Sequence, residues 1–200
     1  MDIKLACTSR RIRRINIKTP LLVPSFSSAV PRIFGDLHSR LKENTPDASL
    51  VSAYDLYHGL VKKDDIWASE VVFIDSGKYE AEAAKSIRST EKREWSRAMY
   101  SKLVDTLQPL ARVVLVNYDE KGRLKNQVSG AQDLFARHPT YAGCFLCKPL
   151  QKKEKLVDVE YLANKITSVE QFDILGLTEK ELGISLLNRC QNILRIREAL

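Results

Sequence analysis

The stretch VVFIDSGKYEAE, residues 71–82, decides how the fold of this chain is interpreted. It opens with an apolar run of the kind that forms a buried strand, and Asp75 stands where that run stops. Ser76 and Gly77 then turn the chain, and Gly77 permits a close backbone approach to a ligand. In parallel α/β folds, polar residues just past the carboxyl ends of strands bind ligands. The alternative is that Asp75 only caps the next segment.

The totals of the sequence restrict its class. Its 200 residues suffice for one large domain or two small ones. A net charge of +7 and a pI of about 9.2 favour an anionic partner, most commonly nucleic acid, although excess lysine also serves solubility. Four cysteines are too few for a disulfide scaffold, which predicts a reduced, cytoplasmic protein. Neither a long apolar run nor a secretory signal is present, so we expect no contact with a membrane.

Strand-like runs alternate with helix-like segments along the whole chain. Strands are expected at residues 21–24, 49–53, 71–75, 112–116, 144–147 and 172–175. Helices are expected at residues 31–44, 80–109, 129–137 and 156–166 and after Thr178, with capping boxes at Ser129/Gln132 and Thr178/Glu181. The stripe of Trp95, Met99, Leu103 and Leu107 predicts a buried helix face. The last helix carries a second apolar stripe on one face, namely Leu182, Leu186, Cys190 and Ile193.

This alternation predicts an α/β fold with a parallel sheet. An open doubly wound sheet and part of a (β/α)₈ barrel both fit the order. No Gly-rich dinucleotide fingerprint or phosphate loop follows any predicted strand, which weakens the nucleotide-binding open sheet. We therefore expect a TIM-barrel-like (β/α)₈ fold with only about six of its eight units present. Residues 1–18 would be a basic N-terminal segment, and residues 19–200 a partial barrel domain.

Polar side chains follow the carboxyl ends of the predicted strands and would converge on one rim of a barrel. Carboxylates on such a rim can accept hydrogen bonds from the ring N–H groups of a base, or shuttle protons. An alternative interpretation is that several of these residues only cap helices, and Thr178 is expected to be a cap. The set comprises Ser27, Ser28, Tyr54, Asp55, Asp75, Ser76, Asn117, Asp119, Glu120, Lys148, Thr178 and Glu179.

The pair Cys144-x-x-Cys147 is similar to half of a zinc site, but the pattern does not predict a metal. Residues three apart on a strand point to opposite faces. No second cysteine pair or nearby histidine completes a set of four ligands. We expect no metal or cofactor in this chain.

Five short stretches, taken in order, resemble motifs of the tRNA-guanine transglycosylase family, which comprises queuine and archaeosine tRNA-ribosyltransferases. They span about residues 19–183, separated by unlike sequence, and only their order is specific. The matches are TPLLVP (19–24) to TPVFMP, VSAYDL (51–56) to NTYHL, IDSGKY (74–79) to T-D-S-G-G-[FY], Asp119-Glu120 to an Asp-Glu pair, and GLTE (176–179) to GLAVGE.

The resemblance implies a (β/α)₈-barrel pentosyltransferase that exchanges a guanine in nucleic acid for a 7-deazaguanine base. The nucleic acid would be tRNA, or DNA in a variant branch. By motif, Asp75 would be the general acid/base and Asp119 would bind the Watson–Crick edge of the base. The backbone of Gly176 and Leu177 would lie against the base. Further substrate-binding residues would be Ser76, Gly77, Tyr54 and Lys148.

The sequence also departs from the family pattern. Lys78 replaces a glycine of the signature, and Lys148 stands where the family has a base-reading glutamine. The family's nucleophilic aspartate and its zinc site would fall beyond Leu200. We therefore expect an incomplete barrel that is inactive in base exchange by itself, that self-associates or needs a partner chain, and that exposes part of the apolar stripe of its last helix. The alternatives are a non-catalytic module that binds nucleic acid or a base and works with a partner, and an unrelated barrel enzyme acting on small anions.

Overall fold

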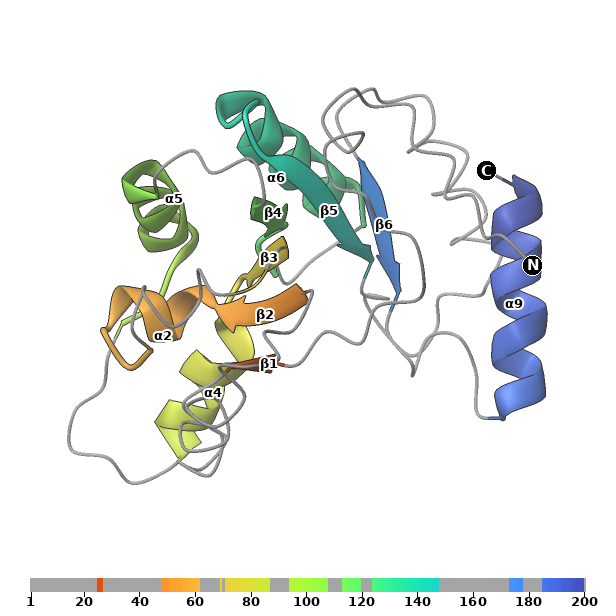
Figure 1. Ribbon diagram of the computed structural model, residues 1–200, viewed down its shortest axis with the longest axis horizontal. Helices are drawn as coiled ribbons and strands as arrows, with labels where there is room; N and C mark the ends of the chain where they lie inside the picture. Colours follow the sequence, from red (N-terminus) through yellow and green to blue (C-terminus); the bar gives the residue numbers. More distant parts are fainter. Residues whose placement is uncertain are drawn as a thin grey trace.

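A computed structural model describes residues 25–26, 48–61, 69, 71–86, 94–107, 113–119, 124–147, 173–177 and 185–199. Its centre is a six-stranded parallel sheet in which every strand pairs with the next along the chain (Figure 1). The strands are β1 (Ser25–Phe26), β2 (Ala48–Ser52), β3 (Val71–Asp75), β4 (Val113–Val116), β5 (Ala142–Cys147) and β6 (Ile174–Leu177). The expected α/β fold with a parallel sheet is confirmed.

Five helices are described between and after these strands: α2 (Ala53–Tyr57), α4 (Lys78–Ser86), α5 (Arg97–Thr106), α6 (Leu124–Arg137) and α9 (Leu186–Ala199). The strand order never reverses, unlike that of a doubly wound sheet. Because crossovers between parallel strands are right-handed, an unreversed order places successive connections on the same face of the sheet.

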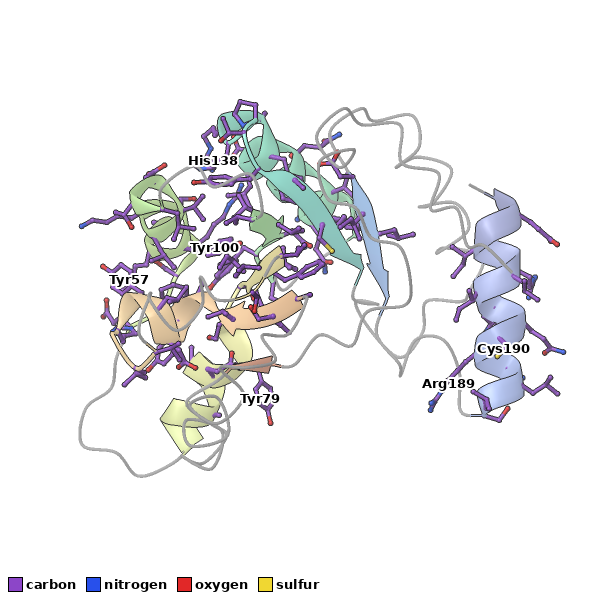
Figure 2. The ribbon with its side chains drawn as sticks, in the orientation of Figure 1. Tyr57, Tyr79, Tyr100, His138, Arg189 and Cys190 are labelled. Carbon is purple, nitrogen blue, oxygen red and sulfur yellow. The ribbon has the colours of Figure 1, made fainter. Side chains whose placement is uncertain are left out.

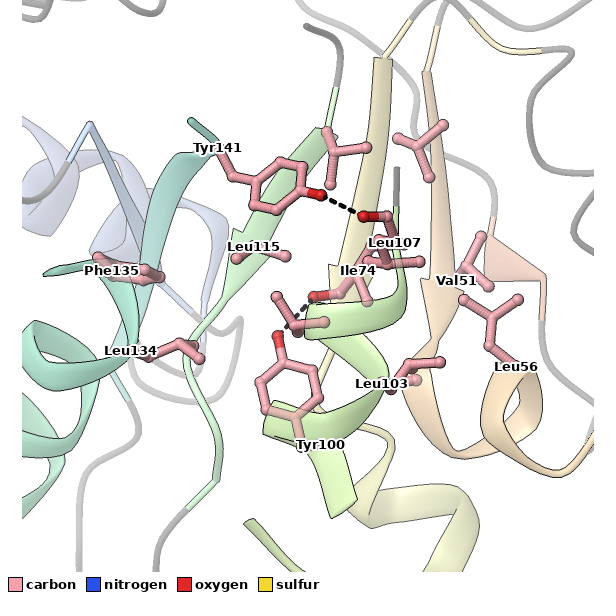
Figure 3. Packing of buried hydrophobic residues seen from close by; sticks show 14 of the residues in the cluster. Val51, Leu56, Ile74, Tyr100, Leu103, Leu107, Leu115, Leu134, Phe135 and Tyr141 are labelled. Carbon is pink, nitrogen blue, oxygen red and sulfur yellow. Dashed lines mark hydrogen bonds between the residues drawn. The ribbon is translucent and has the colours of Figure 1, made fainter. Parts of the chain in front are cut away.

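One face of the sheet, which we call the helix-covered face, packs against α2, α5 and α6. Its cluster joins alternate strand residues, such as Ile74 and Leu115, to helix residues such as Leu56, Leu103 and Phe135 (Figure 3). All five side chains are buried. The alternation with a period of two therefore places every second residue of the sheet under these helices.

The opposite face, which we call the strand-only face, has a separate apolar cluster. Its described members all lie on strands: Ala48, Val71, Val114, Val116, Ala142 and Cys144, with the partly buried Phe73 and Ile174 packed against them. Side chains from neighbouring strands thus cover one another on this face without a described helix between them.

The expectation that residues 80–109 are mostly helical is confirmed for the described residues, but they form two helices, α4 and α5. Residues 94–96 are not helical, and they separate α4 from α5. Ser96 is the N-cap of α5, and its side chain accepts a hydrogen bond from the backbone N–H of Met99 at 3.3 Å. Trp95 therefore precedes the helix instead of belonging to its stripe. The helix buries Tyr100 and Val104 beside Leu103.

Two other boundaries also differ from expectation. Ser129 is not a cap, because α6 begins at Leu124 and Ser129 lies exposed inside it. The sixth strand is Ile174–Leu177, two residues later than predicted. The Asp173 side chain accepts a hydrogen bond from the backbone N–H of Gly143 at 2.8 Å, so Asp173 meets β5 through its carboxylate just before the strand begins.

The first strand is only partly comparable with its prediction. The described strand β1 lies at Ser25–Phe26, directly after the strand predicted at residues 21–24. The predicted strand at 21–24, the helices at 31–44 and 156–166, the Thr178 cap and the segment 1–18 lie outside the described residues.

The expected exposure of the last helix's apolar stripe is confirmed. In α9, Leu186 is 75% exposed and Ile193 47% exposed, and Cys190 is also exposed. Figure 1 shows α9 apart from the helices that cover the sheet. Leu182, the first residue of the predicted stripe, lies outside the described residues. Among the helices described, none combines the length and the apolar character needed to cross a membrane.

Candidate functional site

Asp75 lies at the carboxyl end of β3, on the strand-only face. It is the last residue of the strand. Its side chain lies on the same face of the strand as those of Val71 and Phe73, both of which contribute to the strand-only cluster. In the register of the sheet it stands opposite Ser52, the last residue of β2. The side chain is half-buried. The strand therefore delivers a carboxylate to the edge of a largely apolar face.

Burial, together with the charge of Asp75, raises the pKa values of two groups, Cys144 and Tyr100. Burial, aided by the Asp75 carboxylate, raises the pKa of the Cys144 thiol to about 12. Burial raises the pKa of the Tyr100 hydroxyl well above its usual value, and Asp75 adds to this shift. Both groups thus keep their protons at neutral pH. Cys144 is a neutral neighbour of the carboxylate and neither a nucleophile nor a metal ligand in this state.

Asp119 follows the neighbouring strand β4 by three residues and is half-buried. Because β3 and β4 are parallel neighbours, Asp75 and Asp119 emerge at the same edge of the sheet. Lys78 links the two strand ends, since its ammonium donates a hydrogen bond to the backbone carbonyl of Asp119. The same ammonium lies 5.9 Å from the ring centroid of Tyr118. The lysine that replaces a glycine in the motif therefore connects the β3–α4 turn to the segment after β4.

The turn Ser76-Gly77 is fixed by the protein itself. Ser76 is fully buried, and its carbonyl accepts a hydrogen bond from Trp95 Nε1 at 2.8 Å. Gly77 has φ +70°, and a Cβ atom there would lie 2.3 Å from the backbone nitrogen of Tyr54. The glycine thus lets the turn approach the start of α2 closely, so its close contact in this structure is with the chain's own backbone.

Tyr54 lies next to this turn in an aromatic cluster. Its ring is edge-on to Trp95 at 5.7 Å between centroids and lies 4.5 Å from that of His58. The residue is only 2% exposed. The ring therefore supports the turn from the side of α2. Tyr79, the aromatic residue of the IDSGKY motif, is 71% exposed and points away from the sheet (Figure 2).

Gly176 and Leu177 belong to β6, so they lie two strands away from β4. Gly176 pairs with Leu146 and faces the same side of β6 as Ile174, which belongs to the strand-only cluster. Backbone at this position can border the strand-only face near its carboxyl edge. Lys148, Glu120 and the Ser27-Ser28 pair lie outside the described residues.

Tyr100 is a residue of this site that the sequence did not single out. It is fully buried on α5, and its hydroxyl lies 2.6 Å from the carbonyl oxygen of Val116 and 3.3 Å from that of Ile74 (Figure 3). These carbonyls belong to β4 and β3 at the edge where Asp75 emerges. A tyrosine directly after Met99 in an apolar helix was the available signal, because a buried tyrosine hydroxyl usually finds a partner.

Within the described ranges, no three His, Cys, Asp or Glu side chains gather as metal ligands would. No protein-family model matches the chain, and no curated protein or solved structure matches it. Its site is therefore interpreted from the residues and their arrangement.

Proposed function

We propose that this protein is a tRNA-guanine transglycosylase-like protein that binds guanine or a 7-deazaguanine base at the carboxyl edge of β3 and β4. The observation that carries the proposal is the placement of Asp75 at the end of β3, on the strand-only face, with Asp119 after the neighbouring parallel strand. Ligands of parallel α/β folds bind at this edge of the sheet.

The chemistry of the two carboxylates suits a guanine-like base. Such a base offers N–H donors on its Watson–Crick edge, and an ionised carboxylate is an acceptor for them. In the proposed exchange, the glycosidic bond to guanine breaks and a glycosidic bond to the incoming base forms. Asp119 accepts the hydrogen bonds of the base, and Asp75 gives a proton to the leaving base and takes one from the incoming base. The neutral thiol of Cys144 beside Asp75 leaves the carboxylate as the proton-transferring group.

We further propose that the sheet belongs to a TIM-like (β/α)₈ barrel of which about six units are present. Two features support this. The strand order is sequential, and the strand-only face carries layers of alternate strand residues, as a barrel interior does. The zinc site and nucleophile that the resemblance implies have no assigned residues here, and no step of the proposal passes through them.

Base binding by the purified chain, measured by calorimetry with guanine and 7-deazaguanine, tests the proposal. We expect Asp75→Asn and Asp119→Asn each to weaken binding by about 10- to 100-fold, because each removes a charge-assisted hydrogen bond or its proton acceptor. Asp105→Asn is the matched control, since that carboxylate is 64% exposed on α5. Wild-type affinity in both site variants, or no binding by the wild type, would refute the assignment.

An exchange assay with labelled guanine then separates an enzyme from a binding module. Incorporation into tRNA or DNA that fails in Asp75→Asn supports the enzyme. Base binding without incorporation supports the non-catalytic module that works with a partner. Since the net charge is +7, nucleic-acid binding should weaken with salt, with a slope of log affinity of about 0.9 per phosphate contact on duplex DNA.

A further inference from the structure

We propose that Tyr100 is the positioning residue of this edge: its hydroxyl holds the carboxyl ends of β3 and β4 together so that Asp75 and Asp119 reach one ligand. The role in ligand binding rests on the proposed function. The clamp between the two strands is a separate physical claim and can be tested without any ligand.

The position of the hydroxyl supports a clamp. The β3–β4 pairing runs through Val72–Val113 and Phe73–Val114 to its last pair, Ile74–Leu115. At this point the Tyr100 hydroxyl donates to Val116 O at 2.6 Å and lies 3.3 Å from Ile74 O. One side chain from α5 thus joins the two strands where their ladder ends. The carbonyl of Ile74 directly precedes Asp75.

Packing alone does not require this hydroxyl. A phenylalanine would fill nearly the same volume, yet it would leave two strand carbonyls in a fully buried site without this donor. The hydroxyl also keeps its proton, because burial and the nearby Asp75 charge raise its pKa. It is therefore a permanent donor at neutral pH, beside a carboxylate that it does not neutralise.

A second contact extends from the clamp to Asp119. The Tyr100 ring lies 5.9 Å from the ring of Tyr118. The ammonium of Lys78 lies over the Tyr118 ring and donates to the backbone carbonyl of Asp119. The segment that carries Asp119 is thus contacted by Tyr100 through the Tyr118 ring, and by Lys78, at the start of α4, through the backbone carbonyl of Asp119. Loosening Tyr100 should release both acidic residues.

The substitution Tyr100→Phe tests the clamp, and Tyr141→Phe is its matched control. Tyr141 is also buried, and its hydroxyl donates to a backbone carbonyl, Leu107 O, at 3.0 Å (Figure 3). That bond lies beyond the other end of α5, before β5 begins. Both variants lose one buried hydroxyl donor, so a general loss of stability affects them alike.

We expect amide hydrogen exchange at residues 76–78 and 117–119 to become about tenfold faster in Tyr100→Phe, because losing a buried hydrogen bond changes an opening equilibrium by about this factor. Exchange at the same residues should stay unchanged in Tyr141→Phe. Affinity for 7-deazaguanine should fall about three- to tenfold in Tyr100→Phe alone.

Each outcome decides one claim. If exchange at the two strand ends is the same in both variants, the clamp is overturned. If exchange quickens but the affinity matches that of Tyr141→Phe, the clamp stands and its role in positioning the ligand is overturned. If the wild type binds no base while exchange quickens in Tyr100→Phe, the proposed function fails and the clamp survives.

Discussion

The two faces of the sheet are built from similar strand residues but have different neighbours. On β4, Val113 and Val114 are adjacent and both almost fully buried, yet Val113 belongs to the helix-covered cluster and Val114 to the strand-only cluster. The first cluster draws on three helices. The second is described entirely from strands. Valine, the same residue type, therefore packs against helices on one face and against neighbouring strands on the other.

Polar groups also differ between the faces. On the helix-covered side, the hydroxyls of Tyr100 and Tyr141 and the indole of Trp95 donate to backbone carbonyls, so their polarity is used to join elements. On the strand-only side, Asp75 brings a carboxylate to the edge of an apolar layer that contains the protonated thiol of Cys144. Polar groups of the helix-covered face thus make packing contacts, whereas the strand-only face carries the carboxylate to which we assign the proposed chemistry.

The largest expected effect is at Gly77, which links Asp75 on the strand-only face to the start of α4. We expect Gly77→Ala to reduce the free energy of unfolding by about 3 kcal/mol or more, because a positive φ and a clash act together. A Cβ atom there would lie 2.3 Å from Tyr54 N and 2.9 Å from Ser52 Oγ. Urea unfolding followed by circular dichroism measures the loss.

Gly59→Ala separates strain from collision. Gly59 has φ +68°, nearly the value at Gly77, but nothing lies within 4 Å of a Cβ atom there. Its substitution should cost about 1–2 kcal/mol, the penalty of the left-handed conformation alone. Equal losses in the two variants would show that the turn does not press on Tyr54.

The paired substitutions Val113→Ala and Val114→Ala sharpen the comparison between the faces. Each removes two methyl groups from a side chain that is at most 1% exposed. We expect each to reduce the free energy of unfolding by about 2 kcal/mol, from lost burial plus the residual cavity. A loss well below 1 kcal/mol for Val114→Ala alone would mean that the strand-only face is open to water in solution.

Much of this fold could be predicted because the apolar runs are strong local signals. The strand at 71–75 was placed correctly, since a run of apolar residues ends at Asp75 and a glycine turn follows. The break between α4 and α5 within residues 80–109 was missed for a tertiary reason. Trp95 looks like one member of a helical stripe, but its indole bonds Ser76 O, and Ser96 caps the next helix. Local periodicity carries no information about such a contact.

The candidate site was less predictable than the fold. Parallel strands bring Asp75 and Asp119 to one edge, and the sequence order of the strands was enough to anticipate this. The bond from Lys78 to Asp119 O joins residues 41 apart, and that of Tyr100 to Ile74 O joins residues 26 apart. Pairings of this kind depend on how α4 and α5 sit against the sheet, which no spacing rule supplies.

The smallest expected effect concerns His138, a titratable group where α5 and α6 meet on the helix-covered side. Burial lowers the pKa of His138, while Asp105 of α5 raises it and the adjacent Arg137 lowers it. Because the folded pKa is below the ordinary value of about 6.5, the unfolded chain takes up the proton first as the pH falls. Stability due to neutral His138 is therefore complete above about pH 6.5 and declines below it.

Urea unfolding of wild type and His138→Gln between pH 7.5 and pH 5 isolates this contribution, because other acidic and basic groups act equally in both proteins. We expect the wild type to lose more stability than His138→Gln over this range. Asp105→Asn should widen the difference, since the Asp105 carboxylate, 3.5 Å from His138 Nε2, favours the protonated imidazole. Wild type that instead gains stability relative to His138→Gln at pH 5 would mean that the ion pair with Asp105 outweighs burial. The contact of His138 with Asp105 would then be a charged surface contact and not part of the helix-covered core.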